Sequence, residues 1–260
     1  MKKERLDQLA DNPNLVSGIY NYCDRWCERC THGARCLTFQ MEQDEAGQLP
    51  PEAHDLNNAA FWQRIGDSFA LAREMIEEFL KREGITISEA DLAAAAAQER
   101  LDHARVKKHP CCQAAYAYIG LVDAWFGADD SAWQAKAKEL EQAAELRLPG
   151  RAPRKEFAEL LAAVEVIRFY QYFLYPKIAR ALGGRLDGDE YGDVSGSAKI
   201  ALIAMDRSLG AWSQLHAHFP EREGATLPVL AHLEKLRRAV ERVFPQARAF
   251  VRPGLDESGK

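Results

Sequence analysis

Four cysteines lie close together near the start of the chain, at Cys23, Cys27, Cys30 and Cys36. Their spacing is C-x3-C-x2-C-x5-C within the segment GIYNYCDRWCERCTHGARCLTF. Four thiolates this near to one another can surround one inorganic centre, because each short loop turns the chain back toward it. We therefore predict that these four residues ligate a metal ion or an iron–sulfur cluster, and we refer to residues 18–40 as the cysteine segment.

The spacing of the cysteines favours a cluster over zinc. Structural zinc sites usually combine two C-x2-C pairs, whereas this segment has one such pair, Cys27 and Cys30. The run from Cys27 to Cys36 resembles the C-x2-C-x5-C ligand run of [4Fe–4S] clusters in RecB-like nucleases and in the SPASM extension of radical enzymes. That resemblance covers ten residues and implies only that the spacing suits a cluster. We expect a [4Fe–4S] cluster, with zinc as the alternative and His32 as a substitute zinc ligand.

The neighbours of the cysteines also suit an anionic centre. Aromatic side chains could shield it from water, and arginines could offset its negative charge and donate hydrogen bonds to its sulfurs. The alternative is that the arginines are simply solvated. The aromatic residues concerned are Tyr20, Tyr22, Trp26 and Phe39, and the arginines are Arg25, Arg29 and Arg35.

Two further cysteines, Cys111 and Cys112, follow Pro110. Adjacent residues on a helix point about a third of a turn apart, so the pair is poorly placed to hold one partner. We expect two small core residues at a helix start. The alternative is a reactive thiol, because a helix N-terminus lowers the pKa of cysteine.

A second candidate site consists of charged and tyrosine residues within apolar helices. One face of a predicted helix carries Glu165, Arg168, Tyr172 and Tyr175, and Lys199 and Asp206 share a face of the next. Charges among apolar residues need partners. The simplest pairing joins Glu165 to Arg168 or Lys199, and Asp206 to Arg168 or Arg207. A structural ion-pair network is one interpretation, and a polar catalytic pocket lined by Tyr172 and Tyr175 is the other.

The elements that must position these residues are helices. Helical periodicity predicts a first helix at about 59–82, with Asp55 or Asn57 as its N-cap and Gly84 at its end. Further helices are predicted after Ser88, at 110–127, after Asp129 or Asp130, at 155–182 with a kink or break at Pro176, from 197 to before Pro220, and at 228–244. The fold class is therefore all-α, an irregular bundle of about seven or eight helices. We favour a single domain over 1–260, with the Pro- and Gly-containing linker at 147–155 as the best candidate boundary.

Composition narrows the class of protein. Hydrophobic residues make up 47% and charged residues 28% of the chain, and the net charge is −5, which does not suggest a nucleic-acid or membrane-surface binder. No apolar run follows the first lysines, and no stretch is long enough to span a membrane. We expect a cytoplasmic protein with reduced thiols.

Two blocks of the chain, YNYCDRWCERC and DVSGSAKIALIAMDRS, resemble a group of bacterial helical proteins with no assigned function. The resemblance implies a bacterial cytosolic protein and no particular activity. The leading hypothesis is a metal-binding, iron–sulfur protein in electron transfer or redox sensing, with a protein or redox partner of unknown identity. The alternatives are an enzyme built on the Glu165, Arg168, Tyr172, Lys199 and Asp206 pocket, or a zinc-stapled interaction protein.

Overall fold

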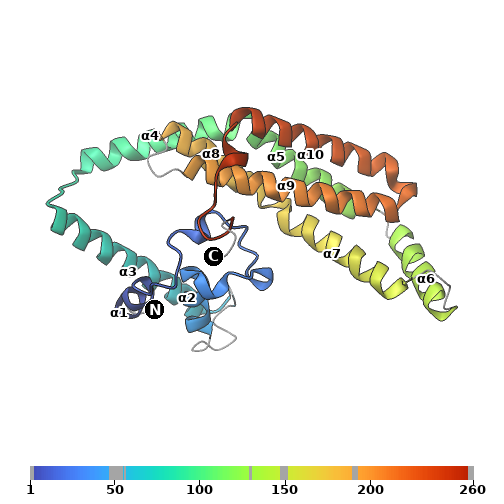
Figure 1. Ribbon diagram of the computed structural model, residues 1–260. Helices are drawn as coiled ribbons and strands as arrows, with labels where there is room; N and C mark the ends of the chain where they lie inside the picture. The colour runs from blue at the N-terminus through green and yellow to red at the C-terminus, as the bar shows by residue number, and fades with distance from the viewer. Residues whose placement is uncertain are drawn as a thin grey trace. The chain divides into compact units, whose positions relative to one another are not determined.

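The fold is all-α, as predicted. The computed structural model describes residues 3–46, 55, 57–128, 131–146, 152–188 and 193–256, and over these residues it contains helices and turns but no strand (Figure 1). Contacts group the chain into two compact units, Met1–Arg100 with Arg252–Lys260, and Leu101–Val251. This division falls inside a helix rather than at 147–155, and residues 147–151 of that linker lie outside the described residues.

The first unit contains the cysteine segment between two short helices. These are α1 (Lys3–Ala10) and α2 (Leu37–Ala46), and they pack on each other. The guanidinium of Arg5 joins them by donating to both oxygens of Asp44, at 2.5 and 3.1 Å. Neither helix was predicted, because α1 is short and polar and α2 has almost no amphipathic pattern to detect.

Helices α3 (Ala59–Glu83) and α4 (Glu89–Lys108) follow. The predicted signals at Gly84 and Ser88 are confirmed, whereas the N-cap of α3 is Asn58 and not the predicted Asp55 or Asn57. Asn58 caps α3 by accepting from the backbone N–H of Ala60 at 2.9 Å, and Gly84 ends it in the left-handed conformation. Ser88 and Asp91 form a reciprocal capping box at the start of α4. These ends are therefore fixed by local hydrogen bonds.

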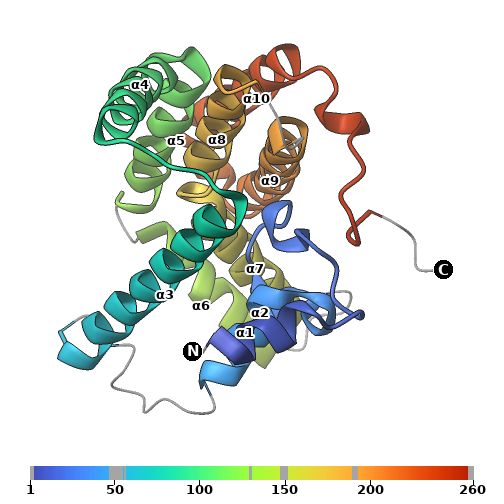
Figure 2. The same cartoon turned by 90° about the vertical axis from the view of Figure 1, so that its left-hand side faces the viewer.

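The second unit is a bundle around α9 (Asp193–His218), which packs against three other helices. They are α7 (Pro153–Gln171), α8 (Leu174–Leu186) and α10 (Glu223–Val243), and α10 also packs on α5 (Pro110–Phe126). Figure 2 views α5, α8, α9 and α10 nearly end-on. The remaining helix, α6 (Ser131–Glu145), packs on α7. Half of the residues of α9 are buried, so its apolar sequence is explained by its central position.

Aromatic side chains fill the core of the second unit. Trp212 is fully buried and its indole N–H donates to the hydroxyl of Tyr118 at 2.9 Å. Trp125 lies edge-on to Trp212, with ring centroids 5.2 Å apart, and donates to Thr226 at 2.9 Å. Each polar end of these large residues therefore has a buried partner, which is the condition for placing Tyr and Trp in a core.

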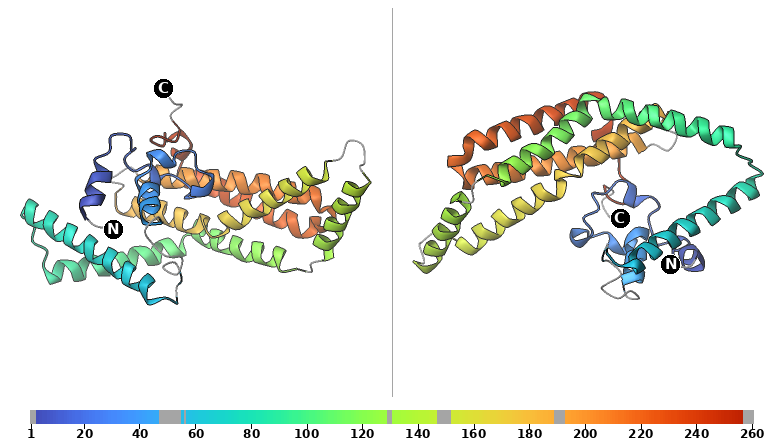
Figure 3. Two further views of the ribbon diagram at one scale, coloured as in Figure 1. Left: turned by 90° about the horizontal axis from the view of Figure 1, so that it is seen from below. Right: turned by 180° about the vertical axis from the view of Figure 1, so that it is seen from behind.

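Of the kink or break predicted near Pro176, the structure has the break. Helix α7 ends at Gln171 and α8 begins at Leu174, so the two follow each other as separate segments (Figure 3). Proline lacks the backbone N–H, and its ring clashes with the carbonyl four residues earlier, which here belongs to Tyr172. The break therefore lies at Tyr172 rather than at Pro176.

The other helix bounds differ from prediction by a few residues. Helix α8 continues through two glycines to Leu186, α9 begins at Asp193 rather than Ser197, and α10 begins at Glu223 rather than Pro228. Tertiary packing extends helices past weak local stop signals. Within the described ranges, no helix combines the length and the apolar character needed to cross a membrane.

Candidate metal centre

Tight 3-10 turns bring the four predicted cysteines together. The turns are Ile19–Asn21, Cys27–Arg29 and Gly33–Arg35. Cys30 and Cys36 are the residues that end the second and third turns, and each donates its backbone N–H to the first residue of its turn at 3.1 Å. Because the chain turns back every few residues, its thiols return to the same side of the segment. The short spacing of the cysteines predicted this arrangement.

All four cysteines line one cavity. It has a volume of about 30 Å³, and its other walls include Tyr20, Trp26, Gly33 and Phe39. Gly33 is required there, because a Cβ atom at this position would lie 2.9 Å from the ring of Phe39. The structure thus brings together the whole predicted ligand set with three of the four predicted shielding aromatics, Tyr20, Trp26 and Phe39.

The thiols lie close enough to influence one another. The pKa of Cys27 is raised to about 11, first by burial and then by the carboxylate of Glu42 and the thiols of Cys23, Cys30 and Cys36. Cys27 is therefore a neutral thiol at pH 7, and a metal that binds there must displace its proton. Glu42 lies on α2, and its nearness to Cys27 was not predicted because no sequence pattern connects the two residues.

Individual sulfurs also contact the backbone. The Sγ of Cys23 donates to the carbonyl of Tyr20 at 3.5 Å, and the Sγ of Cys30 accepts from the backbone N–H of His32 at 3.4 Å. Bonds of the second kind stabilise thiolate ligands and tune the potential of iron–sulfur centres. His32 thus contributes its backbone beside Cys30, and its ring is not part of the cavity wall.

The arginines of the segment lie on its surface. Arg25 and Arg29 are exposed, and their guanidinium groups stack over Tyr20 at 5.8 Å and over Trp26 at 4.1 Å. Arg35 is also exposed. Among the described residues, no group of three or more His, Cys, Asp and Glu side chains meets the geometry of a metal site. The observation that supports a centre is thus the shared cavity of the four cysteines.

Cys111 and Cys112 are core residues, as expected. They are 2% and 0% exposed at the start of α5, where the His109 ring accepts from the backbone N–H of Cys111 at 3.1 Å. Burial raises the pKa of both thiols, that of Cys112 to about 11. The alternative of a reactive thiol with a lowered pKa is therefore wrong, because burial outweighs the effect of the helix terminus.

The second candidate constellation is not assembled into one buried pocket. None of Glu165, Arg168, Tyr172, Lys199 and Asp206 is buried. Arg168 pairs with Asp123 of α5 at 3.3 Å and stacks over Phe126, and the ammonium of Lys199 donates to the carbonyl of Phe250 at 2.5 Å. Glu165 is exposed on α7, and Tyr172 lines a separate cavity with Tyr116 and Tyr175.

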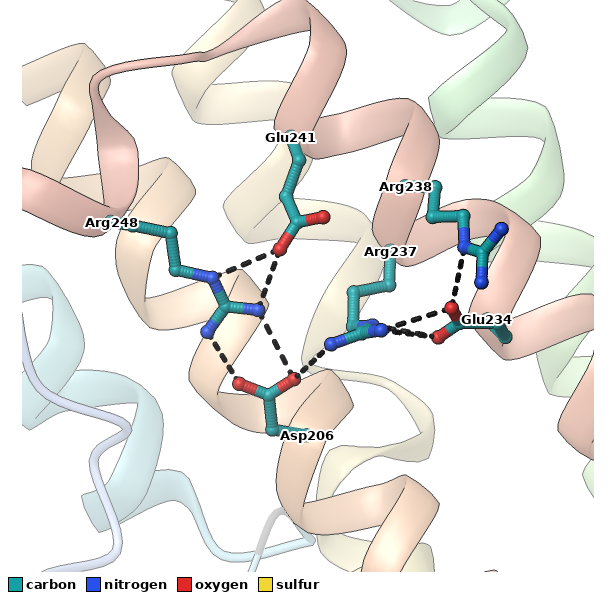
Figure 4. Close-up of polar contacts among 6 residues, drawn as sticks. All are labelled: Asp206, Glu234, Arg237, Arg238, Glu241 and Arg248. Atoms are coloured by element: carbon teal, nitrogen blue, oxygen red, sulfur yellow. Dashed lines mark hydrogen bonds and ion pairs between the residues drawn. The ribbon is translucent and has the colours of Figure 1, made fainter.

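Asp206 belongs to a surface ion-pair network rather than to the predicted pair with Arg168 or Arg207. Figure 4 shows its carboxylate between two guanidinium groups, those of Arg237 at 3.3 Å and Arg248 at 2.5 Å. These arginines also bind Glu234 and Glu241, respectively. The network fastens α9 to α10 and to the segment after it, so Asp206 has a structural role.

Tyr172 lines its cavity because α7 breaks beside it. Comparisons of the chain with family models, with curated proteins and with solved structures find no match.

Proposed function

We propose that Cys23, Cys27, Cys30 and Cys36 hold a [4Fe–4S] cluster and that the protein acts in electron transfer or redox sensing. The single observation that carries the proposal is that all four cysteines, placed by consecutive tight turns, line one cavity. Four thiolates are the complete ligand set of a cubane cluster. Such a cluster would supply one-electron chemistry, and the protein would supply its insulation and its access to a partner.

The spacing of the cysteines supports a cluster more than a single ion. Structural zinc sites usually combine two C-x2-C pairs, whereas this segment has one such pair, Cys27 and Cys30, with a single cysteine on either side. A cluster held at the cavity that all four cysteines line would use each of them as a ligand.

The exposure of the ligands supports exchange with a partner. Cys30 is exposed, whereas Cys23, Cys27 and Cys36 are half-buried. A cluster held by these residues would be covered on most sides and open at Cys30, where a second redox protein could approach. Arg25 and Arg29, exposed on either side of Cys27, would offer positive charge to an acidic partner surface.

A structural zinc ion is the second candidate. The turn from Cys27 to Cys30, followed by the bond from the His32 backbone to Cys30, is equally suited to a zinc thiolate. A zinc-stapled segment would make the first unit an interaction module without redox activity.

Metal content and the visible spectrum of protein purified without oxygen test the proposal. We expect about four iron and four sulfide per chain and a broad visible absorption that dithionite bleaches. Cys27→Ala should abolish both the iron and the colour. The matched control is Cys111→Ala, which removes a buried cysteine outside the segment and should keep both.

Three results would contradict the proposal. Stoichiometric zinc in a colourless protein would show that the centre is a structural zinc ion and not a cluster. Protein that binds no metal after anaerobic reconstitution with iron and sulfide would show that there is no such centre. Equal loss of iron in Cys27→Ala and Cys111→Ala would show that the ligands lie elsewhere.

A further inference from the structure

A second cavity lies in the second unit, far from the cysteine segment in sequence. Its volume is about 940 Å³, within the range of ligand sites in proteins. Its walls come from the end of α4, from α5, and from the break between α7 and α8. We call it the tyrosine cavity, and it is lined by Ala104, Lys107, Lys108, Cys112, Gln113, Tyr116, Ile119, Tyr172 and Tyr175.

Aromatic rings dominate the wall of the tyrosine cavity and face the solvent. Tyr116 is 69% exposed and Tyr172 is 60% exposed, although both are large amphipathic side chains. Tyr116 and Tyr175 meet edge to face, with ring centroids 6.3 Å apart. Exposed tyrosines around a hollow give a flat apolar ligand ring faces to stack on, at little cost in side-chain entropy.

The walls are held in place by buried contacts behind them. Gln171 is fully buried, and its amide donates to the carbonyl of Ile119 at 3.3 Å and to Asp123 at 2.7 Å. It thereby fixes the end of α7 against α5. The break caused by Pro176 then places Tyr172 at the end of one helix and Tyr175 in the first turn of the next.

The charge on the rim of the tyrosine cavity is positive. Lys107 and Lys108 line it from the last turn of α4, and none of the nine lining residues is acidic. Within the described part of the chain, neither lysine has a hydrogen-bond or ion-pair partner, whereas Arg105 in the same turn pairs with Asp102 at 2.9 Å. Burial keeps Cys112, at the wall, a neutral thiol. The charged residues that line the cavity are therefore both cationic, which favours an anionic ligand.

We propose that the tyrosine cavity binds a small aromatic anion, whose ring stacks on Tyr116 and Tyr175 and whose acidic group pairs with Lys107 and Lys108. The ligand class is a flat ring system carrying a carboxylate, sulfonate or phosphate. The tyrosine cavity shares no lining residue with the cavity of the cysteine segment, so this proposal does not depend on whether the protein binds a cluster.

Paired dyes of the same shape and different charge test this proposal on the full-length protein. The anionic probe is 8-anilinonaphthalene-1-sulfonate, and the neutral one is N-phenyl-1-naphthylamine, which lacks the sulfonate. In fluorescence titrations, Lys107→Gln with Lys108→Gln should weaken binding of the anionic dye about tenfold and that of the neutral dye less than about twofold. Tyr116→Ala should weaken both dyes by about two- to tenfold.

Matched controls separate this site from other apolar surfaces. Lys138→Gln removes an exposed lysine of α6, and Phe69→Ala removes an exposed ring of α3; both should leave the titrations unchanged. Circular dichroism checks that each variant is folded. Loss of dye binding in Phe69→Ala, or equal affinities for the anionic dye in the parent and the double lysine variant, would overturn the proposal.

Discussion

Helices α3 and α9 have nearly the same length, 25 and 26 residues, but their environments differ completely. No residue of α3 is buried, whereas 13 residues of α9 are. Helix α3 is defined by local signals, Asn58 at its start and Gly84 at its end. Helix α9 keeps Gly196 and Gly210 within its span, each of which costs about 1 kcal/mol in helix propensity, so packing must hold it. Helix α3 is thus stabilised by local interactions at its two ends, whereas α9 is stabilised by packing along its sides.

The largest expected effect contrasts one aromatic residue from each helix. Trp212→Ala should lower the free energy of unfolding by about 3–5 kcal/mol, because it empties a fully buried site and leaves the Tyr118 hydroxyl without its donor. Phe69→Ala on α3 should change it by less than about 0.5 kcal/mol, since that ring is 71% exposed. Urea unfolding followed by circular dichroism measures both. Similar losses of unfolding free energy in the two variants would contradict the proposed difference between α3 and α9.

Alkaline pH should destabilise the bundle around α9 through Tyr118. Burial raises the pKa of Tyr118 to about 12, whereas an unfolded tyrosine titrates near pH 10. The unfolded state therefore loses its proton first, and stability that is present below pH 10 is lost as the pH rises to 12, by on the order of 3 kcal/mol.

The contribution of Tyr118 is measured by comparing how steeply the free energy of unfolding falls with pH in the parent protein and in two variants. Tyr118→Phe should flatten the slope between pH 10 and 12, at a cost of about 1 kcal/mol at neutral pH for the lost bond to Trp212. Tyr116→Phe, an exposed tyrosine of the same helix, should keep the slope of the parent protein. An unchanged slope in Tyr118→Phe would show that its hydroxyl is not the group responsible.

Removing the cap of α3 should have a smaller and local effect. Asn58→Ala deletes the oxygen that binds the backbone N–H of Ala60, which should cost that helix about 1 kcal/mol. Hydrogen exchange at the first amides of α3 should accelerate, while amides in α9 stay as protected as before. Asn57→Ala is the matched control, because its side chain binds Asp55 and not the helix. Faster exchange in α9 would mean that α3 supports the bundle.

The smallest effect is expected on the solvent face of α9. Asp206→Asn should cost about 0.5–1 kcal/mol, because its pairs with Arg237 and Arg248 are more than a third exposed at the carboxylate. The loss should shrink in 1 M salt, where exposed charges are screened. An undiminished loss at high salt would indicate that packing, not charge, joins the two helices there.

The sequence was most informative where a structural cause is local. Gly84, Ser88 and Pro110 mark helix ends that the structure has within a residue or two, since each acts on its own backbone. The convergence of the four cysteines followed from loops too short to separate them. In both cases the interacting atoms are near neighbours in the chain.

Predictions failed where the deciding partner is remote. Lys199 and Asp206 share a face of α9, but that periodicity cannot show that their partners are Phe250, Arg237 and Arg248. The predicted pairs assumed charges deep in the core, and the structure places these side chains at its edge, where ion pairs form at little cost in desolvation. The predicted pocket lining of Tyr172 and Tyr175 does face a cavity, but the walls that α4 and α5 add to it were missed for the same reason, because they come from separate helices.

The first unit is closed by a segment from the other end of the described chain. Arg252 donates to the carbonyl of Tyr22, 230 residues earlier, and Gly254, with a φ of 70°, lies so close to Val16 that a Cβ atom there would be 3.0 Å from its side chain. During translation, residues 3–46 of this unit leave the ribosome long before Arg252 and Gly254 are made. The first unit can therefore complete its packing only after the whole second unit has been synthesised.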